Sequence, residues 1–153
     1  MDARDVVQAL IARRQTVATA ESLTAGLVCA ALTDVPGSSA AVRGGLVVYA
    51  TDLKAKLAGV DPALLARTGA VHPDVATQLA GGARARCEAD WGLGLTGVAG
   101  PDPQDGILPG TVFVGLAGPG VAVVRELALD GGRAAVRAAS VAAALDLLGE
   151  HLG

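Results

Sequence analysis

The sequence predicts an α/β protein, a single domain with a three-layer α/β/α arrangement around a mixed, mostly parallel sheet. Segments with helical periodicity alternate with short β-prone segments, which is the pattern of a sheet covered by helices on both faces. Two β-prone segments near the end flank Gly118-Pro119-Gly120 and predict a hairpin, which adds antiparallel pairing. A length of 153 residues suits one domain with its own core, and no internal repeat or linker divides it, so the domain is predicted to span 1–153.

The first half of the chain is predicted to alternate helices and strands. Apolar residues recur at helical spacing from residue 3, and Arg13 and Arg14 close that stretch. Gly59 ends a later helix, and Asp61-Pro62 opens the next one with an N-cap residue and a proline at the first helical position. In chain order, the predicted elements are helix 3–14, strand 16–20, helix 27–32, strand 44–50, helix 52–58 and a short helix from 61.

The second half is predicted to contain a long helix, three strands and a final helix. The Gly- and Pro-rich stretch 97–109 is too irregular for either element, and loops of this length in compact domains are usually functional or mobile. The final helix carries apolar residues on one face: Val136, Ala139, Ala143 and Leu147. In chain order, the predicted elements are helix 74–88, strand 91–96, strands 111–117 and 121–127, and helix 132–148.

Composition and charge exclude several classes of function. Hydrophobic residues make up 52% of the chain and aromatic residues 2%, so the core is expected to consist of Ala, Val and Leu, and disorder is excluded. No apolar run approaches the roughly 18 residues that a spanning helix needs, so no membrane partner is expected. Lys plus Arg is 12 and Asp plus Glu is 15, giving a net charge of −3 with no basic block, which argues against nucleic acid as a partner.

The cysteines and the N-terminal segment indicate the compartment. Cys29 and Cys87 form no CxxC pair and have no nearby His, which indicates neither a zinc site nor a disulfide framework. Met1 to Asp5 carries acidic residues and lacks the apolar core of a signal peptide. We therefore expect a reduced, cytoplasmic protein with no metal and no cofactor.

The segment Ala20-Glu21-Ser22-Leu23-Thr24-Ala25-Gly26 is the most informative candidate site. A strand ends here and a helix begins within a few residues, so backbone N–H groups at the helix start lack intrahelical partners. A Ser hydroxyl beside such groups has an oxyanion hole within reach, as in the nucleophile elbows of α/β sheets. Spacing alone favours the simpler interpretation, in which Ser22 or Thr24 is the N-cap of the helix.

A nucleophilic Ser needs a base, and the sequence offers few. His151 lies in a terminal stretch that is expected to fray, and His72 stands at a helix entrance where a structural role is equally expected. The remaining candidates are Lys54 and Lys56, because a Lys desolvated in an apolar site loses its proton near neutral pH. We interpret Lys56 as a solvated charge, and for Lys54 both interpretations stay open.

Three further features are candidates for ligand binding. The small residues of Thr96-Gly97-Val98-Ala99-Gly100-Pro101 let a ligand approach the backbone, and a plain turn explains them equally. Arg133 and Arg137 lie one turn apart near the start of the last helix, where they either bind phosphate or form a solvated face. Tyr49 either packs with a satisfied hydroxyl or stacks on a ligand ring.

Several separated motifs occur in the order found in one family. They are AESLTAG at 20–26, PGSS at 36–39, GGLVVY at 44–49, Lys54, GAV at 69–71, TGVAGP at 96–101 and GTV at 110–112. Together they resemble the CinA C-terminal domain family, including the PncC nicotinamide-nucleotide amidohydrolases. The resemblance covers the chain from about Asp5 to Leu148.

The resemblance implies a metal-independent amidohydrolase that converts nicotinamide mononucleotide to nicotinate mononucleotide and ammonia. It implies Ser22 as the nucleophile, Lys54 as its general base, and Arg133 or Arg137 as the cation for the substrate phosphate. Further residues implied in substrate binding are Glu21, Thr24, Gly26, Tyr49, Thr96, Gly97 and Gly100. The expected partner is thus a small nucleotide, and Ala- and Val-rich helix faces suit a homodimer or higher homo-oligomer.

The chain departs from the family's usual pattern at several positions. In the usual ESCTGG motif, Leu23 replaces Cys and Ala25 replaces the first Gly, and His72 stands where the family often has Ser. A frequent Lys is missing from 107–111. The departures at Leu23 and Ala25 favour an alternative function, a non-catalytic nucleotide-binding domain; an interaction domain linked to competence or DNA damage is the other alternative.

Overall fold

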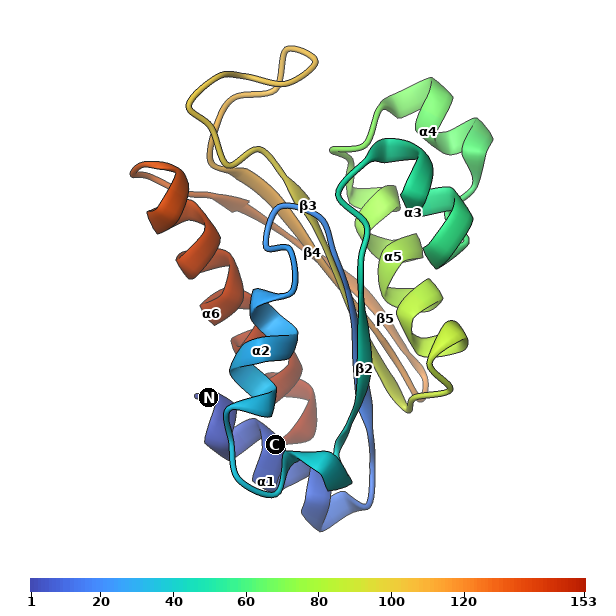
Figure 1. Cartoon of the computed structure of the whole chain (residues 1–153), viewed down its shortest axis with the longest axis vertical. Coiled ribbons are helices and arrows are strands. Elements are labelled where there is room, and N and C mark those ends of the chain that lie inside the picture. Colours follow the sequence, from blue (N-terminus) through green and yellow to red (C-terminus); the bar gives the residue numbers. More distant parts are fainter.

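A five-stranded mixed sheet forms the centre of the computed structural model, which describes all 153 residues. The strand order is β2-β1-β3-β4-β5 (Figure 1). β1 pairs in parallel with β2 and β3, whereas β3 with β4 and β4 with β5 pair antiparallel, so four of the five strands run in one direction. The strands are β1 (Val17–Glu21), β2 (Val42–Val47), β3 (Trp91–Gly97), β4 (Thr111–Gly118) and β5 (Val121–Ala128).

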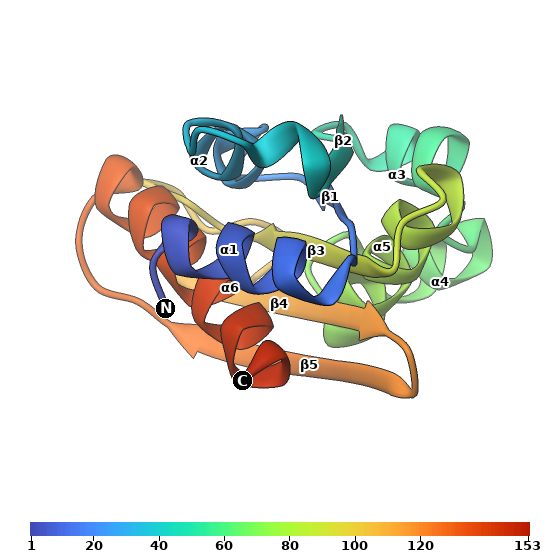
Figure 2. The same ribbon diagram turned by 90° about the horizontal axis from the view of Figure 1, so that it is seen from below.

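Helices cover both faces of this sheet, which confirms the predicted three-layer α/β/α fold. Figure 2 shows α1, α2 and α6 on one face and α3, α4 and α5 on the other. Each face has its own apolar core, of 21 buried residues around Leu10 and Leu148 and of 11 around Leu79. The helices are α1 (Ala3–Arg13), α2 (Leu27–Thr33), α3 (Thr51–Ala58), α4 (Pro62–Thr68), α5 (Pro73–Arg86) and α6 (Arg133–Leu152), with a 3₁₀ turn at Ser38–Ala40. No helix combines the length and apolar character that crossing a membrane requires.

Glycines in the central strands let α5 lie directly on the sheet. A Cβ added at Gly94 would stand 2.4 Å from the backbone nitrogen of Ala80 and 2.6 Å from the carbonyl oxygen of Ala76. A Cβ at Gly115 would stand 2.3 Å from the same Ala76 oxygen. Glycines make the sequence of β3 look less like a strand, and in the fold they allow the helix to pack closely on the sheet.

Two elements end three or more residues away from the position that the sequence predicts. β2 ends at Val47, because its partner β1 ends at Glu21, so Tyr49 lies in the connection to α3 rather than in a strand. α6 continues to Leu152, so the prediction that His151 lies in a frayed tail is wrong. The centroids of the His151 and Trp91 rings are 6.5 Å apart, so the last turn of the helix packs against β3.

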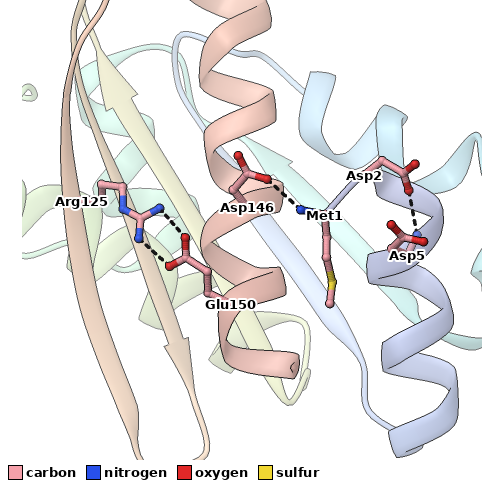
Figure 3. Close-up of polar contacts among 6 residues, drawn as sticks. All are labelled: Met1, Asp2, Asp5, Arg125, Asp146 and Glu150. Carbon is pink, nitrogen blue, oxygen red and sulfur yellow. Dashed lines mark hydrogen bonds and ion pairs between the residues drawn. The ribbon is translucent and has the colours of Figure 1, made fainter.

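Polar contacts join α6 to β5 and to the N-terminal residue (Figure 3). Arg125 on β5 donates two hydrogen bonds to the Glu150 carboxylate, at 3.2 and 2.6 Å. The Met1 ammonium lies 2.9 Å from an Asp146 oxygen on the side of α6 that faces α1. Exposed ion pairs contribute little stability, so the buried apolar residues of α6, among them Val136 and Leu148, hold the helix against the sheet.

Candidate active site

A cavity of about 250 Å³ opens at the carboxyl ends of the three parallel strands. Ser22 follows β1 directly, Tyr49 follows β2, and Thr96 and Gly97 close β3. Ligands of open α/β sheets characteristically bind at this edge. The lining residues are Ser22, Leu23, Tyr49, Ala50, Thr51, Lys54, Ala70, Val71, Thr96, Gly97, Ala99, Gln104 and Arg133.

Ser22 stands where the backbone leaves the sheet. Its N–H donates to Leu95 O at 3.0 Å, which holds Ser22 against β3, and its side chain is buried but lines the cavity. A tight turn follows, in which Ala25 N–H donates to Ser22 O at 3.1 Å. Ala25 and Gly26 both have left-handed backbones, with φ of 47° and 95°. Ala25 therefore adopts a left-handed backbone that a Gly would take without a steric penalty, at a cost of about 1–2 kcal/mol.

Two backbone donors in this turn are free. The N–H groups of Leu23 and Thr24 have no acceptor within the chain, and they come directly after Ser22. Consecutive free N–H groups beside a Ser hydroxyl are the donors from which an oxyanion hole is built. The Thr24 hydroxyl is also fully buried without a partner.

Neither Ser22 nor Thr24 caps the following helix, so the N-cap interpretation is wrong for both. Gly26 occupies the N-cap position of α2 without a side-chain bond. Glu21 supplies the acceptors instead: its two carboxylate oxygens accept from Val28 N at 2.9 Å and from Cys29 N at 3.1 Å. The fully buried Glu21 side chain does not line the cavity, so the structure places this predicted substrate contact under the helix start.

Lys54 is buried, with 1% of its surface exposed, and the solvated-charge interpretation is wrong for it. Its Nζ donates to Val48 O at 2.9 Å and to Tyr49 O at 3.0 Å, and its side chain lines the cavity with Ser22. Burial lowers the pKa of Lys54 to about 8, because an ammonium is poorly solvated there. No direct hydrogen bond joins Ser22 Oγ to Lys54 Nζ. Lys56 is an exposed partner of Asp52, as expected.

Arg133 and Tyr49 meet at the edge of the cavity. Arg133 donates to Tyr49 Oη at 3.2 Å and to Gly100 O at 2.8 Å, and no carboxylate neutralises its charge. Tyr49 is 59% exposed, which excludes the buried-packing interpretation. A cation bonded only to neutral acceptors is available for an anionic ligand.

The remaining predicted residues have other positions. Thr96 is buried in the cavity wall and donates to Ala70 O at 2.7 Å. Arg137 does not line the cavity and bonds instead to Leu23 O. Thr24, Gly26 and Gly100 also lie outside the lining.

The two histidines contribute no base to the cavity, and no metal cluster is present. His72 caps α5, accepting from Asp74 N at 3.1 Å, as its structural interpretation predicts. No cluster of three or more His, Cys, Asp or Glu side chains is placed to hold a metal ion.

Sequence reasoning missed Thr51 and Gln104 as cavity residues. Thr51 begins α3 two residues after Tyr49, and this closeness in the sequence is a signal that could have identified it. Gln104 lies in the long irregular loop, where no sequence pattern predicts a direction for a side chain.

The fold and the site define an α/β domain in which a serine at a strand-to-helix turn shares a cavity with a buried lysine. The model of the CinA C-terminal domain matches residues 2–152, so the chain belongs to this family. A CinA-like protein of Frankia casuarinae is 50% identical over 143 residues, 94% of this chain and 33% of the relative. One of Mycobacterium marinum is 49% identical over 146 residues, 94% of this chain and 34% of the relative. The chain thus spans about a third of the length of these curated relatives.

Solved structures share the fold across nearly the whole chain. A competence-damaged protein (CinA) superfamily protein from Klebsiella pneumoniae superposes with a TM-score of 0.94 at 31% identity, covering 98% of this chain and 94% of that one. A competence/damage inducible protein from Agrobacterium tumefaciens gives 0.90 at 34% identity, covering 99% and 96%.

Proposed function

We propose that this domain hydrolyses the carboxamide of nicotinamide mononucleotide, giving nicotinate mononucleotide and ammonia, with Ser22 as nucleophile and Lys54 as general base. The observation that carries the proposal is a buried lysine in the same cavity as a serine that leads a turn with free N–H groups. A serine hydroxyl is a weak nucleophile unless a base takes its proton. Lys54 and Arg133 are the basic side chains that line the cavity, and only the lysine can lose its proton near neutral pH.

The neutral form of Lys54 suits the role of base. A neutral amine has two N–H bonds, and Val48 O and Tyr49 O accept two hydrogen bonds from Nζ. The lone pair then stays available for a proton. A pyridinium ring bound in the cavity would favour this neutral form further, because like charges repel.

The first half of the reaction forms an ester. Ser22 Oγ attacks the carboxamide carbon while Lys54 takes the hydroxyl proton, directly or through one water molecule. The carboxamide oxygen becomes negative and accepts hydrogen bonds from the free N–H groups of Leu23 and Thr24, each such donor being worth roughly 2.7–4 kcal/mol. As the C–N bond breaks, Lys54 returns its proton to the leaving nitrogen, which departs as ammonia.

The second half releases the acid. A water molecule attacks the ester carbon, and Lys54 accepts a proton from that water. The bond to Ser22 Oγ breaks, and the proton held by Lys54 restores the serine hydroxyl. Nicotinate mononucleotide leaves, and both side chains return to their starting protonation states.

Residues at the cavity edge fit the rest of this substrate. Arg133 has an uncompensated charge for the phosphate, and Tyr49 presents an exposed ring beside it for stacking on the pyridinium. Thr96 and Gly97 form the wall from the third parallel strand.

Ammonia release from nicotinamide mononucleotide tests the proposal. We expect the wild-type chain to release ammonia, and Ser22→Ala to lose at least about 10³-fold in kcat with an unchanged melting temperature. Ser39→Ala is the matched control, because Ser39 is exposed and remote from the cavity lining. Nucleotide binding without ammonia release would support the binding-domain alternative, and full activity of Ser22→Ala would refute the assignment.

A further inference from the structure

Arg137 bonds to the turn that follows Ser22. Its Nε donates to Leu23 O at 2.9 Å, across 114 positions of sequence. It is the only side chain that forms a hydrogen bond with the backbone of residues 22–26. Arg133, one turn earlier on α6, lines the cavity, and Arg137 does not. The two arginines therefore serve different parts of the site.

The contact fixes the peptide unit between Leu23 and Thr24. In a trans peptide, the C=O and N–H bonds point in opposite directions. A Leu23 oxygen held toward α6 consequently turns the Thr24 N–H away from α6, and that N–H is one of the two free donors. The preceding peptide is fixed by the turn itself, since Ser22 O accepts from Ala25 N at 3.1 Å and directs the Leu23 N–H to the other side.

The charge of Arg137 strengthens the same arrangement. No carboxylate lies within ion-pair distance of it. A hydrogen bond from a charged donor is roughly twice as strong as a neutral one, and a carbonyl polarised in this way makes the N–H of its own peptide a better donor. Arg137 thus acts on Thr24 N–H through one peptide group, without touching a substrate.

We propose that Arg137 is a positioning residue for the oxyanion hole: it holds the 23–24 peptide so that Thr24 N–H faces the oxygen that becomes negative when Ser22 attacks. The inference rests on the proposed function. The inference assigns Arg137 a role other than phosphate binding, for which the sequence offered it as an alternative to Arg133.

Steady-state kinetics of ammonia release test this role. Arg137→Met is expected to lower kcat about 100-fold while KM for nicotinamide mononucleotide stays within about threefold, because a misdirected donor weakens only the transition state. Arg137→Lys keeps a charged donor in reach of Leu23 O and is expected to lose only about tenfold. Arg133→Met, on the same helix, is the matched control and is expected to raise KM instead.

Binding of an aldehyde analogue separates positioning from a general loss of structure. In the analogue, a formyl group replaces the carboxamide; Ser22 Oγ adds to its carbon, and the serine proton ends on the former aldehyde oxygen, which occupies the oxyanion hole. We expect Arg137→Met to weaken this analogue by about the factor lost in kcat, and to leave the affinity for nicotinate mononucleotide unchanged. If Arg137→Met does not fold, the same two affinities in Arg137→Lys carry the test.

The outcomes distinguish this inference from the proposed function. A wild-type chain that releases no ammonia refutes the proposed function and this inference with it. An active wild type with an Arg137→Met variant that keeps its kcat, or raises only KM, overturns the positioning role alone. Equal weakening of the aldehyde and the acid also overturns it.

Discussion

Burial makes Lys54 chemically different from Lys56, two positions along the same short helix. Lys54 is 1% exposed and donates to two carbonyl oxygens, whereas Lys56 is exposed and pairs with Asp52. Removing water from the Lys54 ammonium lowers its pKa to about 8. A pKa of about 8 leaves a minor neutral fraction of Lys54 at pH 7, and the neutral amine is the form that the proposed mechanism requires.

The rate is expected to follow the titration of Lys54. In the proposed mechanism only the neutral amine accepts the Ser22 proton, so kcat/KM should rise about tenfold per pH unit below pH 8 and become constant above it. The measurement is kcat/KM for ammonia release between pH 6.5 and 9.5. A profile that is flat from pH 6.5, or that falls as pH rises, would show that Lys54 is not the base.

The Lys54→Arg variant is the control for this profile. Its guanidinium stays protonated across the range, so we expect loss of activity at every pH rather than a displaced curve.

At the scale of elements, the close packing of α5 on the sheet depends on glycines, which have no side chain, at the contact positions in the strands. Gly94→Ala is expected to destabilise the domain by about 3 kcal/mol or more, because its Cβ would stand 2.4 Å from a backbone nitrogen that cannot move independently. Urea unfolding measures the change.

Gly81→Ala provides the matched control within α5. Nothing lies within 4 Å of a Cβ added there, and Gly81 is exposed in the helix interior. This variant should gain about 0.5–1 kcal/mol from helix propensity. Equal effects of the two substitutions would contradict the close-packing explanation.

On the scale of the whole molecule, the last helix completes a site that begins near the start of the chain. α6 brings Arg133 to the cavity edge and Arg137 to the Ser22 turn, and the buried apolar face of α6 packs into the core around Leu10 and Leu148. The site is therefore assembled from both ends of the sequence.

Arg133→Met is expected to raise KM for nicotinamide mononucleotide by about tenfold or more, because the proposed charged hydrogen bond from Arg133 to the substrate phosphate is lost. Nicotinamide riboside, which has no phosphate, should show the same KM with the wild type and the variant. An equal rise for both substrates would place the phosphate elsewhere.

Local patterns predicted most of the fold and several members of the site. Periodicity predicted every helix and strand within a few residues, and the turn at Gly118-Pro119-Gly120 predicted the antiparallel pairing of β4 with β5. The antiparallel pairing of β3 with β4 has no such local signal. Ser22 was recognisable because a strand-to-helix turn has a local signature. Gln104 was not, because no local pattern directs a side chain of an irregular loop toward a distant strand.

The amino-acid sequence by itself determined the alternation of elements, the mixed sheet and the position of the candidate serine, since these follow from spacing and turn chemistry along the chain. Only the tertiary structure decided which interpretation holds for Glu21, Lys54 and Arg137. The role of each residue depends on what surrounds its side chain. The Glu21 carboxylate accepts from the start of α2, and the Lys54 amine is shielded from water. The Arg137 guanidinium donates to Leu23 O, which is 114 positions away in the sequence. Burial and contacts between remote segments arise only when the chain is folded, so no local pattern contains them.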